Sequence, residues 1–85
     1  IMLIKVTAEH IRQGKQGDSF ACALALALDE ATGDAWHVGS TCAGCSRLGN
    51  INLPKSARRF REIFDCRKCD AWPFAFRLAV EPRAV

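Results

Sequence analysis

Four of the five cysteines occur in two pairs, and their spacing is the pattern in this sequence most specific for a chemical role. Cys42 and Cys45 form one Cys-x-x-Cys motif, and Cys66 and Cys69 form a second one after twenty intervening residues. Two thiolates three residues apart in a tight turn can bind one metal ion, and a second such turn completes a tetrahedral set. The spacing therefore predicts a zinc ion held by these four cysteines. Such an ion would be structural, because no coordination position stays open.

The paired cysteines have other interpretations as well. They could be unligated thiols at a fortuitous spacing, or disulfides formed within or between the pairs. They could also form a thioredoxin-type redox site, which is disfavoured because neither pair lies between a strand and the start of a helix. An enzyme acting through a thiol would need an exposed cysteine with a low pKa. The fifth cysteine, Cys22, lies among alanines and leucines and is expected to be a small buried hydrophobic residue.

A basic segment is the second candidate site. Its cations are Lys55, Arg58, Arg59 and Arg61, in a chain whose formal net charge is +3. Clustered cations of this kind can bind phosphates. The acidic residues Glu62 and Asp65 interrupt this basic patch, and no aromatic residue is interleaved on its polar face. The segment is therefore either a solvated helix face or a nucleic-acid-binding surface.

No residues form a recognisable catalytic constellation. His10 and His37 have no serine, cysteine or carboxylate at a spacing typical of a catalytic site, so we expect both to be structural or surface groups. Trp36 and Trp72 are expected to anchor the core, whereas exposure of either one would indicate a protein interface. The sequence therefore predicts a protein that is not an enzyme.

Hydrophobic patterning predicts the elements of the first half of the chain. Residues 2–7 alternate as a strand with one buried face. Thr7 then caps a short helix that ends at Gly14. Residues 20–31 form a second helix, apolar nearly all round, because alanine and leucine favour helices and the stretch is too long for a usual strand. We expect this helix to lie at the centre of the fold.

The second half of the chain contains the cysteine pairs. The expected elements are a strand over residues 35–41, a strand over 47–53, a helix over 55–66 opened by Pro54, and a strand over 74–80 ended by Pro82. The first two strands form a hairpin, and its connection, residues 42–46, carries the first cysteine pair. A strand of seven residues covers roughly 20 Å and the helix returns about 18 Å. Both cysteine pairs should therefore meet at one pole of the domain.

The order β-α-α-β-β-α-β predicts an α+β fold in which helices pack on one mostly antiparallel sheet. At 85 residues the chain has room for a single domain, residues 2–85, with a modest core that a zinc staple would supplement. The odd number of cysteines disfavours a secreted disulfide framework, and neither a signal peptide nor a membrane span is apparent. We therefore expect a cytoplasmic protein.

Short motifs along most of the chain resemble a known group of proteins. They are His10-Ile11, Gly14, Gly17-Asp18, Cys22, Ala25 to Leu28, Val38-Gly39, Leu53-Pro54, Phe60, Phe64-Asp65, Pro73-Phe74, Phe76 and Leu78. This pattern is similar to that of small uncharacterised proteins encoded in phage and prophage genomes. In that pattern a proline usually stands where this chain has Ala23, and a plain turn where it has Cys66 to Cys69. The resemblance implies no catalytic residues and does not extend to the metal site.

These observations predict a small non-enzymatic binding protein of phage or mobile-element type, stapled by zinc, that engages a protein partner. The contact would be a groove beside the central helix or a tryptophan near the zinc. The alternative is a small nucleic-acid-binding accessory protein that uses the basic helix over residues 55–61. Salt dependence separates the two, because phosphate contacts weaken steeply with ionic strength whereas an apolar interface does not.

Overall fold

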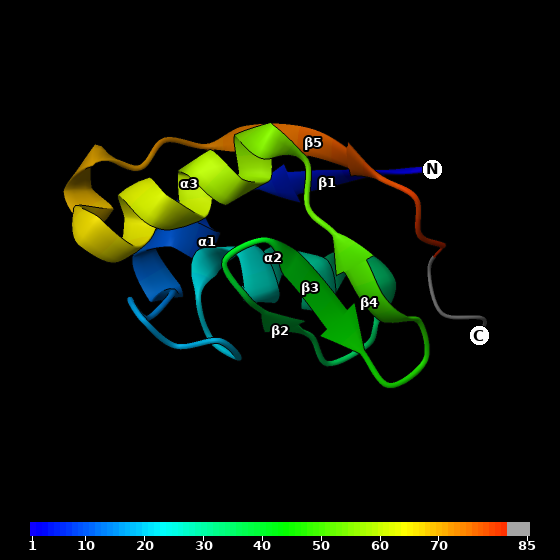
Figure 1. Cartoon of the computed structure of the whole chain (residues 1–85). Coiled ribbons are helices and arrows are strands. Elements are labelled where there is room, and N and C mark those ends of the chain that lie inside the picture. The colour runs from blue at the N-terminus through cyan, green and yellow to red at the C-terminus, as the bar shows by residue number, and fades with distance from the viewer. Residues whose placement is uncertain (82–85) are drawn as a thin grey trace.

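The computed structural model describes residues 1–81 (Figure 1). Its elements are β1 (Met2–Val6), α1 (Ala8–Gln13), α2 (Ala23–Thr32), β2 (His37–Val38), β3 (Cys42–Cys45), β4 (Gly49–Asn52), α3 (Lys55–Cys66), a short 3-10 helix η1 (Lys68–Asp70) and β5 (Phe74–Leu78). The order agrees with the predicted one except for η1 and for a third strand between α2 and α3. The predicted extension of the domain to residue 85 and the role of Pro82 lie outside the described residues.

The strands form two small antiparallel sheets, so the prediction of one sheet is wrong. β1 pairs with β5, with Ile4 opposite Phe76, and the second sheet has the order β2-β3-β4. The two sheets lie apart, and α2 contacts β1 of one sheet and β2 of the other (Figure 1). A helix that is apolar nearly all round must be covered on several sides. Two separate sheets provide that cover.

The first helix begins where the sequence predicts. The Thr7 hydroxyl accepts a hydrogen bond from the backbone N–H of His10 at 3.2 Å, and the Thr7 N–H donates to Nδ1 of His10 at 3.0 Å. Nδ1 is therefore an acceptor, and the other ring nitrogen of His10 donates to the carboxylate of Glu30 on α2. His10 is buried and joins the two helices, in agreement with a structural role.

The central helix begins at Ala23, three residues later than predicted. The side chain of Asp18 accepts hydrogen bonds from the backbone N–H groups of Phe20 and Ala21, at 2.9 and 3.1 Å, which holds this segment in a turn. Phe20 consequently lies outside the helix, and its side chain is exposed. Gly33 ends the helix as expected, with a positive φ of 81° that favours glycine.

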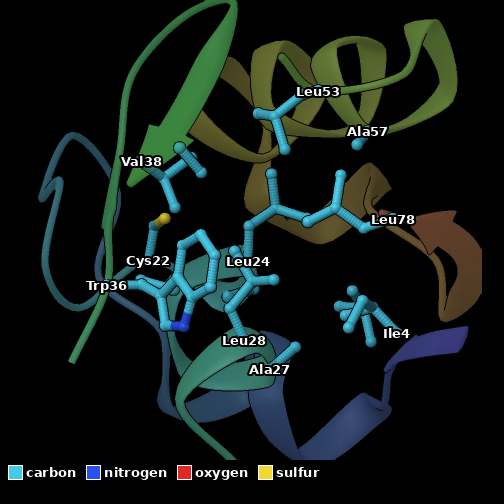
Figure 2. Close-up of a cluster of buried hydrophobic side chains, with 14 of the residues drawn as sticks. Ile4, Cys22, Leu24, Ala27, Leu28, Trp36, Val38, Leu53, Ala57 and Leu78 are labelled. Carbon is cyan, nitrogen blue, oxygen red and sulfur yellow. The ribbon is translucent and has the colours of Figure 1, made fainter. Parts of the chain in front are cut away.

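The core surrounds α2 (Figure 2). Its labelled members come from β1, α2, β2, α3, β5 and the connections between elements, and they are Ile4, Cys22, Leu24, Ala27, Leu28, Trp36, Val38, Leu53, Ala57 and Leu78. Trp36 is 1 % exposed, and its indole N–H donates to the Thr32 hydroxyl at 2.7 Å. The prediction that Trp36 anchors the core is confirmed.

The third helix is amphipathic, as predicted. Ala57, Phe60 and Phe64 are buried against the rest of the domain, and the opposite side of α3 carries mostly charged residues. The ring of Phe60 stacks on that of Phe74 in β5, with centroids 4.7 Å apart. This packing fixes α3 beside the β1-β5 sheet and leaves its charged side facing solvent.

Candidate binding surface on helix α3

The first cysteine pair does not lie in a hairpin loop. Cys42 and Cys45 are the first and last residues of β3, and the turn follows at residues 46–48. Side chains alternate between the two faces of a strand, so residues three apart point in opposite directions. Cys45 is buried on the core side, whereas Cys42 is half-buried. In this conformation the two thiols do not converge on one ion.

The second pair lies at the end of α3. Cys66 is the last residue of the helix, Cys69 lies in η1, and both are exposed. Within residues 1–81 there is no group of three or more histidine, cysteine or acidic side chains placed to hold a metal ion. The structure therefore does not support the expected meeting of the two pairs in one metal site, and it places the first pair in a strand and not in the hairpin turn. As placed, these residues do not fit a tetrahedral site made of four cysteines.

The remaining cysteine behaves as predicted. Cys22 is 0 % exposed, and burial raises the pKa of its thiol above the ordinary value. A buried, protonated thiol is a poor nucleophile. Cys22 therefore contributes packing volume to the core beside α2.

The predicted basic residues do come together. A groove of about 750 Å³ runs along the outer side of α3 beside the connection between β2 and β3. Its lining residues are Ser40, Lys55, Arg58, Arg59, Arg61, Glu62, Asp65 and Cys66. All four cations that the sequence singled out are in this list, so their clustering is real.

The four cations are not equivalent. The Arg61 side chain is only 11 % exposed; its Nε donates to Asp65 at 3.0 Å, and its guanidinium also donates to the carbonyls of Val38 and Gly39. These hydrogen bonds of Arg61 therefore connect α3 to the end of β2 and the residue that follows it. The other three cations are exposed and form no ion pair with any of the residues from 1 to 81.

An exposed tryptophan borders the same helix. Trp72 follows η1 and is 78 % exposed, in contrast to the prediction that it anchors the core. It borders a hollow of about 250 Å³ lined by Ser56, Arg59, Phe60, Ile63, Asp70, Ala71, Trp72 and Phe74. The sequence pattern of α3 does not by itself predict an aromatic residue beside the basic face. The residue comes from the following loop, where it precedes Pro73.

A third hollow connects the first two. It has a volume of about 470 Å³ and is lined by Arg59, Glu62, Ile63, Cys66, Arg67 and Asp70. Arg59 lines all three hollows, so the basic groove and the tryptophan hollow form one continuous surface. We call it the α3 surface and define it by Lys55, Arg58, Arg59, Ile63 and Trp72.

Comparison with known proteins finds no match to any family model, curated protein or solved structure. The resemblance to small phage proteins therefore stays a prediction. In the part of the chain that the structure describes, no helix has both the length and the apolar character needed to cross a bilayer.

Proposed function

We propose that this protein is a non-enzymatic binding protein and that it takes a protein partner on the α3 surface, with Trp72 at the centre of the contact. The observation that carries the proposal is the 78 % exposure of the Trp72 side chain next to a hollow whose lining is mostly apolar. Tryptophan and arginine are the residues most enriched among those that dominate binding energy. Trp72 and Arg59 line the same hollow.

The packing beneath Trp72 supports the same proposal. The floor of the hollow includes Phe60 and Phe74, whose rings stack on each other, and Ile63 is 36 % exposed at its rim. A floor made of stacked rings is rigid, so little conformational entropy is lost when a partner side chain enters. A volume of about 250 Å³ suits a small number of partner side chains.

Site-specific photo-crosslinking tests this function. A photoreactive phenylalanine analogue replaces Trp72 in one variant and Phe20 in a matched control, since Phe20 is also an exposed aromatic residue at 69 %. We expect a discrete protein adduct from position 72 and none from position 20 when the variants are irradiated in the cells that carry the gene. Absence of an adduct at position 72, or equal adducts at both positions, would contradict the proposal.

A second candidate function is nucleic-acid binding through the basic groove. The observation that favours it is the row of exposed cations Lys55, Arg58 and Arg59 along one side of α3. Three phosphate contacts on a duplex would weaken binding by roughly 40-fold between 50 and 200 mM salt. Fluorescence anisotropy with a labelled random-sequence duplex measures this dependence. The candidate fails if reversing the three charges leaves the affinity unchanged.

A further inference from the structure

Several charges near the α3 surface are satisfied within the protein. Arg61 is paired with Asp65, and Arg67 with Asp70 at 3.4 Å. Lys68 donates to two backbone carbonyls near the end of α1, at 2.8 and 2.9 Å. Arg61 and Lys68 thereby connect α3 and η1 to neighbouring segments, whereas the pair of Arg67 and Asp70 is local and exposed. These groups offer little free charge to a partner.

The remaining charges are predominantly positive. Lys55, Arg58 and Arg59 are exposed, and within residues 1–81 they form no ion pair, while Glu62 is the exposed acidic residue among them. Lys55, Arg59 and Glu62 lie at intervals of four and three residues, so they share one side of the helix. Arg59 is also four residues before Ile63, which places a free guanidinium directly beside the apolar rim of the tryptophan hollow.

We infer that the partner presents an acidic peptide segment with an apolar or aromatic anchor: the anchor enters the hollow beside Trp72, and carboxylates of the segment bind Arg59, Arg58 and Lys55. The inference rests on the proposed function and adds the chemistry of the partner. Charge complementarity argues for it, since Arg59 borders the apolar hollow, and the exposed cations Lys55 and Arg58 line the adjoining groove. A guanidinium binds a carboxylate through two parallel hydrogen bonds, which gives Arg58 and Arg59 the geometry as well as the charge.

The apolar hollow favours a peptide over a nucleic acid. Phosphate and ribose groups gain nothing from a lining of Phe60, Ile63 and Phe74, whereas an aromatic or aliphatic side chain loses its hydration there. A continuous surface that is cationic at one end and apolar at the other matches a segment in which acidic residues lie on one side of a hydrophobic anchor. The basic groove and the hollow meet at Arg59.

Selection from a displayed library of random twelve-residue peptides tests the inference. The full chain is immobilised, and peptides that also bind the Trp72→Ala variant are removed before sequencing. We expect the enriched peptides to carry a net negative charge and at least one large apolar residue. An enriched pool that is neutral or basic would overturn the inference and leave the proposed function standing. A pool with no Trp72-dependent binder would overturn both.

Affinities of the enriched peptides then test the pairing itself. The double variant Arg58→Glu with Arg59→Glu should weaken binding at least tenfold. The matched control is Lys5→Glu with Lys15→Glu, which makes the same change in net charge at two exposed positions outside the α3 surface. The control should change the affinity less than twofold at 0.15 M salt. Equal losses in the two double variants would overturn the pairing, as would tighter binding of a single-stranded oligonucleotide than of any enriched peptide.

Discussion

Helices α2 and α3 have nearly opposite surroundings. Six of the ten residues of α2 are buried, whereas three of the twelve residues of α3 are. α2 contacts both sheets, α1 and α3, so it is covered from most directions. α3 is covered on one side, and its other side borders all three hollows. Packing around α2 therefore contributes most to the stability of this small domain, whereas α3 presents charged groups to solvent.

The largest expected effect is loss of core packing at α2. Leu28 is 0 % exposed, so Leu28→Ala should lower the free energy of unfolding by about 2 to 5 kcal/mol through lost burial and a residual cavity. The matched variant on α3 is Ile63→Ala, at a residue that is 36 % exposed, and it should cost less than about 1 kcal/mol. Urea denaturation followed by tryptophan fluorescence, in which buried Trp36 becomes exposed to solvent, measures both. Similar losses in the two variants would contradict the division of roles between the helices.

A second expected effect separates two arginines within α3. Arg61→Ala should lower the free energy of unfolding by about 1 to 3 kcal/mol, because it removes the hydrogen bonds to Asp65 and to the carbonyls of Val38 and Gly39. Arg59→Ala should change it by less than about 0.5 kcal/mol, since Arg59 is exposed. Thermal denaturation of the two variants checks this order. The reverse order would mean that Arg59 and not Arg61 holds the helix in place.

Thiol accessibility gives a third comparison of the same helices. Cys22, directly before α2, is fully buried, whereas Cys66, the last residue of α3, is exposed. In variants that keep one cysteine each, Cys66 should react with a thiol reagent without delay. Cys22 should react at least roughly 1,000-fold more slowly than Cys66, because the reagent reaches its thiol only when the protein unfolds. Equal rates would contradict the burial of Cys22.

Zinc content and thiol labelling together test the predicted zinc site. If zinc binds Cys42, Cys45, Cys66 and Cys69, elemental analysis of protein purified without a metal-affinity step gives about one zinc per chain. Thiol labelling of the two exposed cysteines would then accelerate after chelation. The placement of the four thiols leads us to expect metal-free protein, in which a chelator changes neither the labelling rate nor the melting temperature. A melting temperature that falls on chelation would favour a rearranged site in which all four cysteines bind the ion.

Local patterns account for the parts of the fold that the sequence predicted. The cap at Thr7, the end of α2 at Gly33 and the amphipathic α3 depend on residues within about one turn of one another. Long-range contacts decide the rest. The segment Cys42–Cys45 contains a glycine and lies between the two predicted strands, which favours a turn, yet it pairs with β2 on one side and β4 on the other. Those two pairings outweigh weak strand propensity.

The candidate surface was predicted only in part for the same reason. The spacing of Lys55, Arg58 and Arg59 on one helix is a local property and could be derived from the sequence. The exposure of Trp72 depends on how η1 turns the chain away from α3 before β5, and nothing in the residues around it specifies that path. The sequence did not distinguish Arg61 from the other three cations of the basic segment. The backbone carbonyls that it binds, those of Val38 and Gly39, lie 23 and 22 residues away in the sequence.

The smallest expected effect concerns a carboxyl group of α2. Partial burial raises the pKa of Asp29 above its ordinary value, and a hydrogen bond from the backbone N–H of Trp36, at 2.7 Å, offsets part of that shift. Because the pKa is higher in the folded state, the folded protein binds more protons than the unfolded chain between the two pKa values. The contribution of Asp29 to stability is therefore greatest below about pH 4 and declines as the pH rises through the folded pKa. Asp29→Asn keeps an oxygen that can accept from Trp36 and removes the titration, so its stability relative to the parent should rise between about pH 3 and pH 6. Urea denaturation across that range measures the difference in free energy of unfolding between Asp29→Asn and the parent protein. If that difference does not change with pH, the end of α2 that carries Asp29 is as open to solvent as the outer side of α3.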